Sequence, residues 1–387
     1  KRNFVDIPDG FKKKHESVVP ISGGLSFGIC FSLFFSGSFL LGFFNLTPYF
    51  DIQIPAEGFG SIESFPYVSF FWLLFLSLVL LMICLIDDLI SLPVWVRLFS
   101  QISCTILMIQ LADMNLVNLG AIFGGSDLIL PNYLAFLFTI FCVVGITNAF
   151  NWIDGIDGFF SFQVLIALIG LAIIGRAGFT LAHLSLAAAL LPYSLMNLGL
   201  FGKKFKVFIG DHGAMMIGFF LACSFIFLTQ DPVNEYESHA RPIEALWCVG
   251  LVLLNAFRVI WKRFIKNLSI FSSDREHIHH YFLDQGYTNR QTLLIVCSIS
   301  FSISAFGLLL FFLNSDNPIN FSSLFNIPVE IISKSTVVTV PGKKKVSGCI
   351  FLVSSIFKKR ADCMFCVLPV GGGKLLSYCP CHVDFKR

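Results

Sequence analysis

Four clusters of polar residues interrupt this otherwise apolar sequence, and their residue types suit chemistry on anions. The first is the pair Asp87 and Asp88, which ends an apolar run of about twenty residues. Adjacent carboxylates raise the proton affinity of at least one member unless a cation compensates. The pair is therefore either a site that handles a cation or a proton, or only the polar end of a membrane helix.

The second cluster combines amides and carboxylates in the eleven residues from Asn148 to Gly158. Asn148, Asn151 and Asp154 are spaced three apart, so a continuing helix would bring them towards one face. Hard oxygen ligands suit Mg²⁺, which takes one or two carboxylates and leaves positions for water and phosphate oxygens. We therefore favour a cation site, with Asp157 nearby, over a polar cap followed by a Gly-rich turn.

The third cluster is the sequence Gly-Asp-His-Gly around Asp211, which follows three lysines between positions 203 and 206. Taken alone it could be a simple turn before the next apolar run. Glycines let the backbone approach a ligand closely, and lysines attract an anionic substrate. In this context we interpret the cluster as part of an anion-binding site.

The fourth cluster contains three histidines within four positions, His277, His279 and His280. They could form a zinc site, but the surrounding loop has no cysteine and no convincing fourth ligand. Arg275 beside them indicates an anion instead, because guanidinium and imidazole groups donate hydrogen bonds to phosphate and sugar oxygens.

The elements that position these clusters must lie in a membrane. Of the 387 residues, 56% are hydrophobic and 13% are charged, whereas roughly a quarter are charged in a soluble domain. Apolar runs of about 20 residues cross a bilayer as helices, which satisfy their own backbone. We predict an all-α, polytopic membrane bundle with about nine spans. These are residues 25–45, 67–86, 97–112, 133–150, 159–175, 178–201, 213–229, 243–261 and 292–313.

Lysine and arginine are distributed unequally between the predicted loops. If the segment before Leu25 is cytoplasmic, the inward loops carry most of the basic residues, and the outward loops up to Leu313 carry only Arg176 and Arg241. This asymmetry is the positive-inside signature. All four polar clusters then lie on the cytoplasmic side.

In chain order, these clusters resemble the motifs of the polyprenyl-phosphate N-acetylhexosamine-1-phosphate transferases, the MraY/WecA superfamily. The similarity includes Val5-Asp6-Ile-Pro8 and Pro20-Ile-Ser-Gly-Gly24 and extends to about Arg290. It is greatest to the bacterial enzymes that transfer N-acetylglucosamine-1-phosphate from UDP-GlcNAc to undecaprenyl phosphate. The resemblance implies release of UMP, initiation of a cell-envelope glycan such as O-antigen, and a cytoplasm-facing site in the bacterial inner membrane.

The resemblance also implies roles for single residues. Asp211 would bind Mg²⁺, or alternatively Mn²⁺, with Asn151 as a second contact. The paired aspartates would prepare the lipid phosphate for attack, Phe208 would stack on uracil, and Arg97 would contact the diphosphate. The implied catalytic acids are Asp87, Asp88, Asp154 and Asp157, and the other implied substrate contacts are Asn148, Arg275, His277, His279 and His280.

Three positions depart from the pattern of this family. Ser91 stands where a third acid is usual after the aspartate pair, and Ala214 replaces a serine. Asn255 occupies a position where an aspartate is expected. Loss of that carboxylate makes a catalytically impaired homologue an alternative.

The resemblance ends at Leu313, which divides the chain into a transferase domain, residues 1–313, and an atypical tail, residues 314–387. Basic residues in this tail begin on the outer side, against the positive-inside rule. We expect the tail to be disordered or altered.

The partners expected from these features are a UDP-N-acetylhexosamine, a polyprenyl phosphate and the membrane, with a homodimer as a further expectation and no nucleic acid. Alternatives are transferases that use another UDP-N-acetylhexosamine or UDP-MurNAc-pentapeptide. A lipid or solute transporter is the alternative from another class, because buried carboxylates also couple ions in such proteins.

Overall fold

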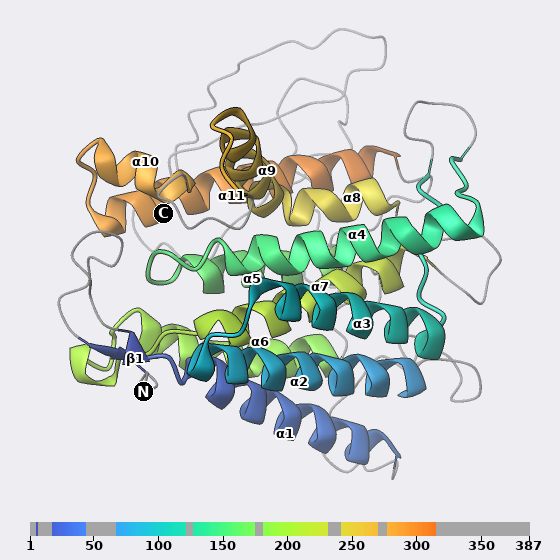
Figure 1. The fold of residues 1–387 in the computed structure, drawn as a ribbon, viewed down its shortest axis with the longest axis horizontal. Helices are drawn as coiled ribbons and strands as arrows, with labels where there is room; N and C mark the ends of the chain where they lie inside the picture. The colour runs from blue at the N-terminus through green and yellow to red at the C-terminus, as the bar shows by residue number, and fades with distance from the viewer. Residues whose placement is uncertain are drawn as a thin grey trace, which may run out of the picture. The chain divides into compact units, whose positions relative to one another are not determined.

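A computed structural model of the chain shows an all-helical fold, apart from one short pair of antiparallel strands and one isolated bridge among the described residues (Figure 1). Strands β1 (Val5–Asp6) and β2 (Val19–Pro20) form the pair. The all-α prediction is confirmed. The structure describes residues 5–6, 18–43, 67–120, 127–174, 181–230, 241–269 and 277–314. The tail beyond residue 314 therefore lies outside the described residues.

Eleven α-helices occur among the described residues. They are α1 (Gly23–Phe43), α2 (Tyr67–Ile90), α3 (Val94–Ala112), α4 (Asn132–Asn151), α5 (Phe159–Ile174), α6 (Leu181–Asn197), α7 (Gly210–Thr229), α8 (Pro242–Cys248), α9 (Gly250–Ile265), α10 (Ile278–Asp284) and α11 (Asn289–Asn314). A short 3-10 turn, η3 (Lys203–Phe205), precedes α7.

Five of these helices, α2, α3, α4, α7 and α11, are long and apolar enough to cross a membrane, and α8 with α9 makes a sixth if the bent pair is one span. The protein is thus a multi-pass membrane protein. The predicted number of nine spans is not confirmed, since α5 and the described part of α1 are shorter apolar helices.

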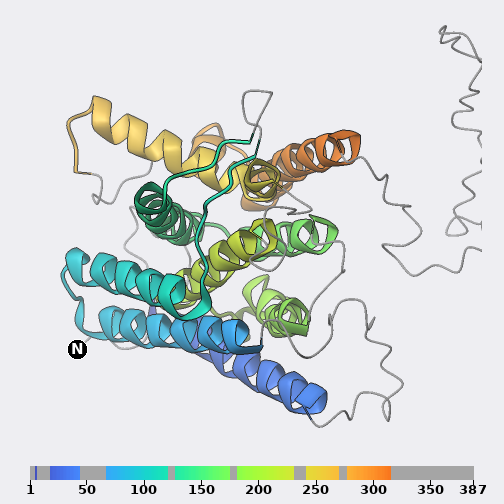
Figure 2. The same ribbon diagram turned by 90° about the vertical axis from the view of Figure 1, so that its right-hand side faces the viewer.

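One predicted span, residues 243–261, is not a straight helix. α8 and α9 meet at an angle of 83°, and Figure 2 shows α9 turning away from the axis of α8. Val249 between them has φ −115° and ψ 16°, outside the helical range. A Cβ atom on Gly250 would lie 2.7 Å from the Ile303 side chain of α11, so the chain packs closely against α11 directly after the bend.

Helix α7 is the most deeply buried of the spanning helices and packs against α1, α2, α4 and α5. Its first turn touches the first turn of α1. A Cβ atom on Gly24 would lie 2.7 Å from the Cα atom of Gly213, so both positions require glycine. This close approach places Asp211, at the start of α7, against the ends of neighbouring helices.

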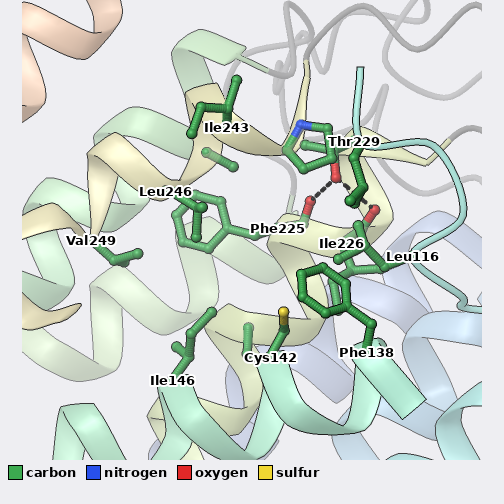
Figure 3. A pocket seen from close by; sticks show the side chains of 14 residues that line it. Leu116, Phe138, Cys142, Ile146, Phe225, Ile226, Thr229, Ile243, Leu246 and Val249 are labelled. Atoms are coloured by element: carbon green, nitrogen blue, oxygen red, sulfur yellow. Dashed lines mark hydrogen bonds between the residues drawn. The ribbon is translucent and has the colours of Figure 1, made fainter. Parts of the chain in front are cut away.

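A separate apolar cavity of about 110 Å³ lies between α4, α7 and α8 (Figure 3). Phe138, Cys142, Phe225 and Leu246 are among its lining residues. The hydroxyl of Thr229 donates to backbone carbonyls of its own helix. The cavity therefore presents almost no polar surface, and none of the predicted site residues lines it.

Candidate active site

Three aspartates and one arginine meet where α2 ends and where α3 and α7 begin. Arg97 lies between two of the acids: its Nε atom is 3.2 Å from Asp87 Oδ2, and its Nη1 atom donates to Asp211 Oδ2 at 3.1 Å. Asp88 is the third acid of this group. The guanidinium compensates part of the negative charge that these carboxylates concentrate in one place.

A tight turn between α2 and α3 creates this geometry. The Ser91 amide donates to the Asp87 carbonyl at 2.7 Å, and Ser91 has φ +56°. Pro93 directly precedes α3, where its missing amide hydrogen costs no helical hydrogen bond. The chain thus reverses between Asp87 and Arg97, and Ser91, the position of the family's third acid, contributes to the turn.

His212 also belongs to the acidic group, although the sequence analysis assigned it no role. Its Nδ1 atom lies 2.6 Å from Asp88 Oδ2, and the histidine side chain is fully buried. A Cβ atom on Gly210, which has φ +71°, would lie 2.6 Å from the His212 ring and 3.3 Å from Asp88 Oδ2. The first glycine of Gly-Asp-His-Gly therefore leaves room for this contact.

The polar residues of α3 and α4 form a second contact beside the acids. Asn148 Nδ2 donates to Gln101 Oε1 at 2.6 Å and to the Val144 carbonyl at 2.8 Å. Gln101 is buried, one helical turn after Arg97. The spacing of four residues from Arg97 was the only sequence signal that could have identified Gln101.

The second predicted cluster divides where α4 ends. Asn148 and Asn151 lie in α4, but the helix stops at Asn151, so Asp154 lies in the following turn. A single helical face for the three residues is therefore not formed. Asn151 Oδ1 is buried without a hydrogen-bond partner among the described residues, which leaves an oxygen available to a ligand.

Asp157 is paired with a lysine that the sequence analysis noted only as part of a basic run. Lys206 Nζ lies 2.6 Å from Asp157 Oδ2 and 5.3 Å from the centre of the Phe208 ring. Asn197 connects the same two segments, because it accepts from the Gly158 amide at 2.7 Å and donates to the Val207 carbonyl at 3.0 Å. The predicted residues Asp157 and Phe208 thus lie close together.

The motif Pro-Ile-Ser-Gly-Gly holds the backbone of Phe208. The Phe208 amide donates to the Pro20 carbonyl at 2.9 Å, and the Gly23 amide donates to the Phe208 carbonyl at 3.0 Å. This motif therefore positions the segment that carries Phe208 and leads directly into α7, whose first turn contains Asp211.

The histidine cluster packs against the turn that contains Asp154. His279 is buried, and a Cβ atom on Gly155 would lie 2.3 Å from its ring, so only glycine fits there. The rings of His279 and His280 have centroids 4.2 Å apart. Nearby, buried Arg263 of α9 lies 5.3 Å over the Trp152 ring, a cation–π contact. Arg275 lies outside the described residues.

Asn255 connects α9 to the histidine cluster. Its Oδ1 atom accepts from the Ile278 amide at 2.9 Å, and its Nδ2 atom is 3.4 Å from His277 Nδ1. The side chain of Asn255 is buried. The residue that departs from the family pattern therefore caps the start of α10.

The two predicted metal ligands, Asp211 and Asn151, carry oxygen atoms that suit a magnesium ion. Among the described residues, no group of three or more His, Cys, Asp or Glu side chains has the arrangement of a dedicated metal site. Mg²⁺ differs from metals that need such a site, because it binds through one or two carboxylates and otherwise keeps water and substrate oxygens. The Asp211 carboxylate and the buried Asn151 Oδ1 atom are ligands of this kind.

Fold and site together define a multi-pass membrane protein with a cluster of charged side chains at the helix ends. The family model of glycosyl transferase family 4 matches residues 70–229, which include Asp87, Asp88, Asp154, Asp157 and Asp211.

Several relatives cover most of the chain. The undecaprenyl-phosphate alpha-N-acetylglucosaminyl 1-phosphate transferase of Escherichia coli is 30% identical over 315 residues, 80% of this chain and 77% of the relative. The protein of that name from Salmonella typhi is 31% identical over 76% of this chain and 73% of the relative. The one from Haemophilus influenzae is 32% identical over 79% of each. The chain belongs to this family of glycosyl transferases and is a phosphoglycosyl transferase.

Proposed function

We propose that the protein transfers N-acetylglucosamine-1-phosphate from UDP-GlcNAc to undecaprenyl phosphate and releases UMP. The observation that carries this proposal is the cluster at the ends of three apolar helices, where Arg97 contacts Asp87 and Asp211 and where His212 contacts Asp88. The reaction named by the relatives has two polyanionic substrates, one of which is a lipid. A polar site at the ends of membrane helices suits such a pair.

In this reaction an oxygen of the lipid phosphate attacks the β-phosphorus of the UDP-sugar. The bond between that phosphorus and the bridging oxygen breaks, and UMP leaves. Phosphoryl transfer of this kind depends on positioning and on neutralising charge more than on a protein nucleophile. We assign Asp88 and Asp87 to the lipid phosphate, with one of them accepting its proton, and Arg97 to the diphosphate.

Mg²⁺ is the proposed cofactor, with Mn²⁺ as the alternative, and Asp211 and Asn151 would hold it. When bound, the ion would neutralise charge on the diphosphate and on the departing UMP. Arg97 Nη1 lies 3.1 Å from the Oδ2 atom of Asp211, the proposed metal ligand. The guanidinium is therefore next to the place where the diphosphate would bind.

The two ends of the UDP-sugar are assigned to segments on either side of this centre. Phe208 would stack on uracil, and Lys206, which lies over its ring and is paired with Asp157, would be next to the nucleotide. His277 and His280 would contact the sugar-phosphate end, with His279, which is buried against Gly155, packed behind them. Asp154, in the turn packed against His279, would line the site between them.

The orientation that we propose places this site at the cytoplasmic face of a bacterial inner membrane. Its support is the excess of lysine and arginine in the loops that carry the polar clusters. The product would be the lipid-linked sugar on which a cell-envelope glycan such as O-antigen is built.

The reaction can be tested by isotope exchange. Membranes that contain the protein, undecaprenyl phosphate, UDP-GlcNAc and Mg²⁺ should move label from UMP into UDP-GlcNAc, because the transfer is reversible. Membranes without the protein, and samples with a chelator, are the controls. A transporter would show no exchange. If a correctly inserted protein moves no label into UDP-GlcNAc, the proposal is refuted.

Mass spectrometry of the lipid product, with other UDP-N-acetylhexosamines and UDP-MurNAc-pentapeptide as competitors, identifies the sugar.

Asn255 offers a test of whether the departure from the family pattern impairs the enzyme. Asparagine and aspartate both accept a hydrogen bond through a side-chain oxygen, so Asn255→Asp should keep the Ile278 contact and change the exchange rate by less than about 3-fold. Asn255→Ala leaves the Ile278 amide without this partner, and we expect a loss of about 10-fold or more, since the histidine cluster loses its anchor. A large gain for Asn255→Asp would instead identify the native residue as impairing.

A further inference from the structure

We propose that His212 is a positioning residue that fixes the orientation of the Asp88 carboxylate for the reaction described above. The inference rests on the proposed function and adds His212 to the residues that serve it. Its basis is the contact of 2.6 Å between His212 Nδ1 and Asp88 Oδ2.

The burial of the two side chains separates their roles. The His212 side chain has no exposed surface, so it cannot touch a substrate in this arrangement. The Asp88 side chain keeps 12% of its surface exposed. Asp88 can therefore meet a ligand while its Oδ2 atom remains bound to the imidazole.

The adjacent aspartates are held by different partners. Asp87 Oδ2 contacts the guanidinium of Arg97 on α3, whereas Asp88 Oδ2 contacts His212 on α7. Successive residues of a helix point about 100° apart. A separate anchor for each acid therefore keeps Asp88 from turning towards Arg97. The guanidinium holds Asp87, and the imidazole holds Asp88.

The surrounding backbone preserves the contact. Gly210 is close to both partners, and a side chain there would collide with the His212 ring. Gly213, one residue beyond His212, packs on Gly24. Glycine at these two positions therefore allows the close packing in which the His212 imidazole meets Asp88.

Three substitutions of His212 separate a positioning role from simple packing. The amide nitrogen of asparagine can take the place of histidine Nδ1, because both atoms are the same number of bonds from Cα. The amide nitrogen of glutamine is one bond further from Cα and lies near the place of histidine Nε2. We expect His212→Ala and His212→Gln to lower kcat of the exchange reaction by about 10²-fold, with KM for UDP-GlcNAc changed by less than about 3-fold. His212→Asn should recover about 10-fold of that loss.

Met216→Leu is the matched control, because Met216 is another fully buried residue of α7 and makes no polar contact with the acids. It should retain the wild-type kcat. The thermal stability of each purified variant in detergent is measured alongside. The positioning role would be overturned if kcat falls only in proportion to the loss of thermal stability and if His212→Asn is no more active than His212→Gln.

The outcomes also distinguish this inference from the reaction on which it rests. A wild-type protein without exchange would remove the proposed function and the role of His212 with it. Exchange that persists at the wild-type rate in His212→Ala would remove only the role of His212.

Discussion

Replacing Asp211 by asparagine should lower the exchange rate by about 10³-fold or more, while the protein still inserts into the membrane. Asparagine has nearly the same shape and can still accept a hydrogen bond from Arg97 Nη1, which lies 3.1 Å from the native carboxylate. The substitution therefore removes mainly the charge. A site that neutralises a diphosphate through a cation depends on that charge.

The matched control for this substitution is Asp113→Asn. Asp113 follows the far end of α3 and adopts the left-handed conformation with φ +49°, which asparagine also accepts. It is sixteen residues beyond Arg97, so about 24 Å of helix separates it from the acidic group. Initial rates of label transfer at saturating UDP-GlcNAc measure the effect. Near-normal exchange by Asp211→Asn would remove Asp211 from the proposed metal site.

Arg97→Ala should reduce the exchange rate by about 10²-fold to 10³-fold, and Arg97→Lys should recover only a small part of the loss. The native guanidinium contacts Asp87 through Nε and Asp211 through Nη1. Lysine has one nitrogen on a flexible chain and cannot reproduce two contacts with fixed geometry. Alanine leaves the neighbouring carboxylates without their compensating cation.

Arg290→Ala is the corresponding control, because Arg290 is exposed in the first turn of α11. Rates at several UDP-GlcNAc concentrations show whether Arg97 acts on binding, on turnover or on both. Full activity in Arg97→Lys would mean that a positive charge suffices and that the two-point contact has no part in the reaction.

Much of the fold follows from composition and periodicity. Helices occupy the long apolar runs, and α2, α4, α7 and α11 lie close to their predicted limits because a chain in a bilayer must form its hydrogen bonds within each segment. The bend between α8 and α9 was not predicted. It lies where Gly250 packs closely against Ile303, which is more than fifty residues further along the chain.

For the site, the sequence by itself singled out the acids and the histidines, because charged groups are rare in apolar segments and mark functional positions. Arg97 and Phe208 were assigned through the family resemblance. The sequence did not identify the partners that hold them. Three pairs form only after segments that are distant in sequence pack together: His212 with Asp88, Gln101 with Asn148, and Lys206 with Asp157. Hydropathy is a property of consecutive residues, whereas these contacts depend on distances across the bundle, so only the tertiary structure could decide them.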